Sequence, residues 1–155
     1  MDQTRELLRH TLASLAYRAT RAVENAPADF ATFDACGREP GKILAHMGDL
    51  LDWALSLAKG HQQWHNSIPL PWKAEVERFY AALGALDDYL ASPEPVHTSI
   101  ERLFQGPVAD ALTHVGQLAM LRRIAGCPTR GENFFVAEIA SGKVGVDQAP
   151  PVKTF

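Results

Sequence analysis

Hydrophobic side chains recur every three or four residues in four long segments of the chain. In the first of them Leu8, Leu12 and Leu15 follow this spacing, which places apolar residues on one face of an α-helix. The pattern therefore predicts four amphipathic helices. They are expected over residues 3–25, 41–59, 71–91 and about 98–125.

Turn-forming residues separate the predicted helices. A connector of about 15 residues, from Asn25 to Pro40, follows the first helix, and Gly60 ends the second. The loop of residues 61–70 leads to Pro71, which suits the first position of a helix. These signals predict a long connection on either side of the second helix.

The fourth helix carries two local signals of its own. Thr98 and Glu101 have the spacing of a capping box, with a hydroxyl at the N-cap and an acid three residues later. Pro107 lies inside the predicted span, where it predicts either a kink or a late start of the helix. Gly126 and Pro128 mark the end.

Four helices of about 20 residues, with no strand pattern of similar strength, predict an all-α fold, and a four-helix bundle is the economical way to bury their apolar faces. The chain of 155 residues has the length of a single domain, residues 1–155. From about residue 129 the pattern becomes mixed, so we expect an irregular C-terminal tail.

Composition narrows the classes of function. The chain has 15 basic and 18 acidic residues and a net charge of −3, so no basic surplus exists to neutralise phosphates and no nucleic-acid partner is expected. No apolar run approaches the roughly 20 residues that span a bilayer, and no signal peptide is recognisable. With 2 cysteines, too few for a disulfide framework, a cytoplasmic protein is the simplest interpretation.

Candidate chemistry comes from polar residues on the second and fourth helices. Asp110 and His114 are four residues apart, a spacing that puts both on one helix face, where they can converge on one ion. His46, on the second helix, lies about 100° from the centre of its apolar stripe, at the flank of the core. Ordinary solvated helix faces show the same spacing, so the residues alone leave both interpretations open.

Two segments resemble the DinB-like (YfiT-type) family of four-helix bundles. The stretch from Asp110 to Leu118, followed by Arg122 and Gly126, resembles the last helix of that family, in which a His often precedes Arg-Gly-Gln-Leu and another His lies four residues earlier. The stretch from Ile43 to Leu51 resembles the segment that supplies a third His. The tail also resembles tails seen in this superfamily.

The resemblance implies a divalent-metal site formed by His46, Asp110 and His114. Asp110 stands where the family commonly has His, which leaves zinc, nickel, manganese and iron all open as the metal. Val115 replaces the usual Arg. The resemblance further implies an up-down-down-up helix order, a possible homodimer, and metal-dependent chemistry on an unknown small-molecule substrate, with a low-molecular-weight thiol as a candidate cofactor.

Several residues near this triad are candidates for supporting roles. Asp49 is placed to accept a hydrogen bond from an imidazole, Trp53 to wall a substrate pocket, and Gln117 to hold a bound water; simple solvation or packing are the alternatives. His61 and His65 form a rival four-residue spacing, but in a predicted loop, where solvation is favoured over reaching the site as a fourth ligand.

Two functional hypotheses follow. The first is a metal-dependent enzyme that activates a thiol or water, as a thiol S-transferase, isomerase or hydrolase. The second is a non-catalytic dimeric helical bundle or ligand-binding module with a degenerate metal site.

Overall fold

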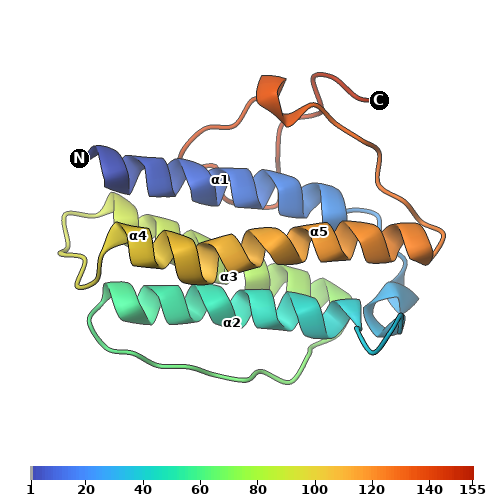
Figure 1. Cartoon of the computed structure of the whole chain (residues 1–155), viewed down its shortest axis with the longest axis horizontal. Helices are drawn as coiled ribbons and strands as arrows, with labels where there is room; N and C mark the ends of the chain where they lie inside the picture. The colour runs from blue at the N-terminus through green and yellow to red at the C-terminus, as the bar shows by residue number, and fades with distance from the viewer. Residues whose placement is uncertain (1) are drawn as a thin grey trace.

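The computed structural model describes residues 2–155 and is all-α, and no β-strand forms within that range (Figure 1). This confirms the predicted all-α, helical-bundle class. The four long helices are α1 (Gln3–Val23), α2 (Pro40–Ala58), α3 (Trp72–Ala91) and α5 (Ala109–Ile124). Shorter elements are η1 (Ala28–Thr32), α4 (Ile100–Leu103), η2 (Phe104–Val108) and η3 (Phe134–Val136).

The first three helices begin and end within two residues of their predicted bounds. Asp2 caps α1 by accepting a hydrogen bond from the backbone N–H of Thr4. Gly60 follows the end of α2 with φ 85°, and Gly126 follows α5 with φ 80°. Both glycines take the left-handed conformation that ends a helix without a steric penalty.

The last helical segment differs from the simple prediction. Ser99, not Thr98, is the N-cap, because its side chain accepts from the backbone N–H of Arg102 at 3.2 Å. Pro107 neither breaks the helix nor delays its start, since it lies in the π-helical turn η2 between α4 and α5. Proline has no N–H for the usual i to i−4 bond, and a wider turn accommodates that loss.

One hydrophobic cluster joins the four long helices. Its fully buried members include one side chain from each: Leu12, Met47, Leu83 and Leu118, each 0% exposed. The apolar faces predicted from the spacing are therefore the faces that meet. Within residues 2–155, none of the helices combines the length and the hydrophobicity needed to cross a membrane.

The loop of residues 61–70 runs back along α2 (Figure 1). Near the end of α2, Ser56 Oγ accepts a hydrogen bond from the backbone N–H of Gln63 at 3.0 Å. Further back, the Asp49 carboxylate accepts from the backbone N–H of Ser67 at 2.9 Å and from its hydroxyl at 2.6 Å. These bonds fix the loop against the outer surface of α2.

A cluster of charged residues secures the α2–α3 seam beneath the loop. Arg78 of α3 donates to Glu75 at 2.6 Å and to Asp49 at 3.1 Å. Both carboxylates are buried, at 0% and 4% exposure of the residue. Because both carboxylates are desolvated, loss of Arg78 would leave two buried negative charges without their counter-charge.

The tail from residue 129 has only one short helical turn and lies across α1, at the opposite side of the view from α2 (Figure 1). Glu132 forms an ion pair with Arg21 of α1 at 3.1 Å and accepts a hydrogen bond from Tyr17. Val144 joins the hydrophobic cluster. The predicted irregular tail is confirmed, and it packs on the bundle.

Candidate metal site

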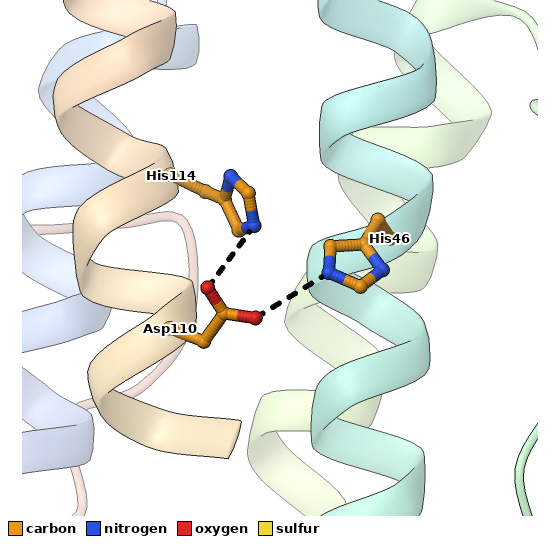
Figure 2. Close-up of side chains that lie close together, drawn as sticks. All are labelled: His46, Asp110 and His114. Carbon is orange, nitrogen blue, oxygen red and sulfur yellow. Dashed lines mark ion pairs between the residues drawn. The ribbon is translucent and has the colours of Figure 1, made fainter. Parts of the chain in front are cut away.

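The side chains of His46, Asp110 and His114 meet between α2 and α5 (Figure 2). The Asp110 carboxylate lies between the two imidazoles, with Oδ2 3.5 Å from Nε2 of His46 and Oδ1 3.3 Å from Nε2 of His114. One potential ligand atom from each residue lies within 4.8 Å of the other two. The structure thus brings together the three residues that the sequence singled out.

Two of the separations are close to those between ligand atoms of one metal ion; they end on different oxygens of Asp110, and all three residues offer one atom within 4.8 Å of the others. N–H···O hydrogen bonds usually measure about 2.7–3.2 Å, shorter than the two contacts in the triad. Ligand atoms that each lie about 2.0–2.1 Å from a tetrahedral ion are roughly 3.3–3.4 Å from one another. A site of two imidazoles and one carboxylate with this spacing is able to hold a divalent ion.

The site lies at the rim of the bundle. The His114 side chain is 10% exposed, whereas those of His46 and Asp110 are 39% and 47% exposed. A centre of three protein ligands with an open side leaves coordination positions for water or substrate, as catalytic metal sites require.

Gln117 orients the most buried imidazole of the triad. Its side-chain oxygen lies 2.8 Å from Nδ1 of His114. Since that oxygen only accepts, Nδ1 donates to it, and Nε2 is the nitrogen that faces Asp110. The role predicted for Gln117, holding a water, stays a prediction beside this direct contact with the imidazole.

Trp64 forms a wall beside the triad that sequence reasoning missed. Its ring centroid lies 5.8 Å from that of His46 and 5.8 Å from that of Trp53, with edge-to-face geometry in both pairs. Trp53, the predicted wall, therefore lies behind Trp64. The indole N–H of Trp53 is buried and has no hydrogen-bond partner within the described residues.

Asp49 has a different role from the one predicted. Its carboxylate accepts hydrogen bonds from Ser67 and Arg78, so its bonding capacity serves the loop and α3 instead of an imidazole. His61 and His65 are both exposed, and neither belongs to the cluster of potential ligands.

A small cavity of about 100 Å³ adjoins the imidazoles of His46 and His114. Arg38 and Lys42 line it, together with Glu39, which pairs with Lys42 at 2.6 Å and raises the pKa of that amine. A larger cleft of about 710 Å³ shares Glu39 and Lys42 with this cavity. The larger cleft touches no residue of the triad, so it is the small cavity that adjoins the two imidazoles.

Comparison of the chain with family models, with curated proteins and with solved structures gives no match. The functional assignment therefore rests on the chemistry of the residues described above.

Proposed function

We propose that this protein binds a divalent transition-metal ion through His46, Asp110 and His114 and uses it to activate a thiol or water. The observation that carries the proposal is the convergence of three ligand atoms within 4.8 Å from helices far apart in the sequence. The donor set of two nitrogens and one oxygen suits zinc, nickel, manganese or iron.

We infer that the bundle has the up-down-down-up helix order of the DinB-like family. In support, Arg9 early in α1 pairs with Asp87 late in α3 at 3.0 Å, as antiparallel helices require. Arg78 early in α3 donates to the carbonyl of Ala45 early in α2, as in parallel helices. Arg122, late in α5, donates to a carbonyl in the last turn of α1, so these two helices run in the same direction.

A bound divalent ion would supply Lewis acidity, which lowers the pKa of a thiol or water. The protein's own residues would do the rest. Gln117 holds the His114 imidazole in the tautomer whose Nε2 is free, and Trp64 shields one side of the site from solvent. Arg38 and Lys42 place positive charge beside the cavity, where they would attract an anionic nucleophile such as a thiolate.

Transfer of a low-molecular-weight thiol to an electrophile, isomerisation and hydrolysis all use this chemistry.

The second candidate is a non-catalytic dimeric bundle with a degenerate site. The position of the Asp110 carboxylate favours this candidate, because it lies within ion-pair distance of both imidazoles. If the two histidines are protonated, the carboxylate can pair with them and no metal ion is needed. Met120 and Ile124 of α5, 57% and 58% exposed, would supply apolar area to a homodimer.

Metal analysis of the purified full chain distinguishes the two candidates. We expect close to one equivalent of zinc, nickel, manganese or iron in the wild type after incubation and dialysis, and loss of it in His46→Ala and His114→Ala. His10→Ala changes an exposed histidine of α1 and serves as the matched control, which should retain the ion. Equally low metal in all four proteins, with no rise in Tm on addition of any of these ions, would contradict the proposal.

A further inference from the structure

A second cleft lies between α1, α5 and the C-terminal tail. Its volume is about 480 Å³, within the range of roughly 300–1,000 Å³ typical of small-molecule sites. Its α5 wall includes Leu112, Val115 and Gly116, whereas the metal triad uses Asp110 and His114 of the same helix. The cleft is thus separate from the candidate metal site.

The charged residues that line this cleft are all cationic. They are Arg18 and Arg21 of α1 and Arg130 of the tail, with no Asp or Glu among the lining residues. Arg21 is neutralised by its ion pair with Glu132 at 3.1 Å. Within residues 2–155, neither Arg18 nor Arg130 belongs to an ion pair. In a protein of net charge −3, two unpaired guanidiniums at one cleft favour an anion.

Arg18 is held in place by an aromatic side chain of the tail. Its guanidinium carbon lies 4.1 Å from the centroid of the Phe134 ring, a cation–π contact. The Arg18 guanidinium makes no hydrogen bond or ion pair within the described residues, so its N–H groups are available to an oxyanion. Paired N–H donors fit a carboxylate or phosphate in a bidentate arrangement.

The rest of the lining is small and apolar. Ala22, Leu112, Val115 and Ala119 contribute apolar surface, and Gly116 leaves room between them. A Cβ placed on Gly116 would meet no atom within 4 Å, so the space above this residue is open. An apolar floor beneath two guanidiniums is complementary to a flat hydrophobic body that carries one anionic group.

We propose that this cleft binds a small amphipathic anion, in which a carboxylate or phosphate monoester contacts Arg18 and Arg130 and an apolar ring system lies over Gly116. This site is independent of the metal triad and adds a second ligand to the protein.

Titration of the full chain by calorimetry and by ¹H–¹⁵N NMR tests the proposal with 2-naphthoate, 2-naphthyl phosphate, neutral 2-naphthamide and inorganic phosphate as probes. We expect the first two to bind and to shift the amide signals of Gly116, Ala119 and Thr129. Their relative affinity identifies the preferred anionic group. Naphthamide and inorganic phosphate each lack half of the required chemistry and should bind at least 10-fold more weakly.

Two variants test the two halves of the cleft. Arg18→Gln combined with Arg130→Gln should weaken naphthoate binding by about 10-fold or more, the scale of one lost charge-assisted hydrogen bond. Gly116→Leu should abolish binding, because the leucine side chain would fill the cleft. Leucine is also a better helix former than glycine, so the substitution should preserve α5. Arg123→Gln, an exposed arginine of α5 outside the cleft, is the matched control and should bind as the wild type does.

The His114→Ala variant separates this proposal from the metal site, since it should lose metal but keep naphthoate binding. Equal binding of naphthoate and naphthamide, or unchanged binding by both cleft variants, would overturn the proposal whatever the outcome of metal analysis.

Discussion

The side-chain oxygen of Gln117 lies 2.8 Å from Nδ1 of His114, one turn along α5. This bond engages Nδ1 and turns Nε2 toward Asp110, where it is the potential ligand atom. We predict that Gln117→Met, which removes the acceptor and keeps the length of the side chain, weakens zinc binding by about 10–100-fold. Competition with a fluorescent chelator measures the change.

Gln117→Glu supplies the control for that experiment, because a carboxylate also accepts from Nδ1 and should preserve the affinity. Gln117 is exposed, so neither variant should change the free energy of unfolding by more than about 0.5 kcal/mol. Unchanged zinc affinity in the Met variant would show that the bond does not position the ligand.

Trp64 should report metal binding by its fluorescence. Its ring lies 5.8 Å from His46, close enough for a bound paramagnetic ion to quench the indole emission. We predict saturable quenching by Cu²⁺ or Ni²⁺ and little by zinc, whose d shell is filled. Trp64→Phe should lose most of the response, whereas Trp72→Phe, which alters a ring packed on Phe30, should keep it. Quenching of equal size in both variants would place the ion elsewhere.

Asp110 is expected to set the metal preference. Carboxylates favour harder ions than imidazoles do, so Asp110→His should strengthen nickel and zinc binding relative to manganese. The ratio of the manganese Kd to the zinc Kd, measured for both proteins at one pH, is predicted to rise in the variant. A ratio that stays constant would argue that Asp110 is not a ligand.

Asp49 is predicted to matter for stability. Its buried carboxylate, 4% exposed, bonds Arg78 at 3.1 Å and also holds Ser67 of the loop. Asp49→Ala should lower the free energy of unfolding by about 3 kcal/mol, because it leaves Arg78 with less compensation. Asp52→Ala removes a carboxylate that is 45% exposed and 3.6 Å from Arg78, and should cost less than about 1 kcal/mol. Urea unfolding of both variants makes the comparison, and equal losses would contradict it.

Alkaline pH should destabilise the fold through its buried tyrosines. Burial raises the pKa of the Tyr80 phenol well above its ordinary value of 10.0, and its oxygen lies 2.6 Å from Thr20 Oγ1. Above about pH 10 the unfolded chain loses the phenolic proton that the folded chain retains, so the free energy of unfolding falls with pH, by up to about 1.4 kcal/mol per pH unit for each such group.

Tyr80→Phe tests this dependence, because it removes the group that titrates and keeps the ring. Urea unfolding between pH 8 and pH 11 should show a shallower decline in the variant than in the wild type. Tyr17, whose pKa is also raised, first by burial and then by its hydrogen bond with Glu132, accounts for part of the decline that remains. Parallel curves for the two proteins would contradict the assignment to Tyr80.

The helices were largely predictable because each depends on local spacing and on end signals. Gly60 ends α2 in a left-handed conformation that glycine adopts readily. The apolar faces predicted for α1, α2 and α3 are the faces that pack in the hydrophobic core. The turn at Pro107 was less predictable. A proline in a helical pattern is compatible with a kink, a late start or a π turn, and packing against the other helices decides among them.

The proximity of Asp110 and His114 was also accessible from sequence, since their four-residue spacing guarantees a shared helix face, whereas His46 joined them through the family resemblance. The surroundings were not. Trp64 lies beside His46 in a loop that is anchored to α2 through Ser56 and Asp49. The Asp49–Ser67 contact joins residues 18 positions apart, which no periodicity encodes.

The π-helical turn at residues 104–108 ends two residues before Asp110, the first triad residue of α5. Each residue of an α-helix turns the chain by about 100°, so a sequence one codon shorter or longer, where the change is not absorbed by this turn, would carry Asp110 and His114 away from His46 with all three side chains still encoded. Among descendants of such a gene, the capacity to hold an ion would be gained or lost by insertion and deletion at a position that never touches it. An inventory of conserved histidines would not detect that change.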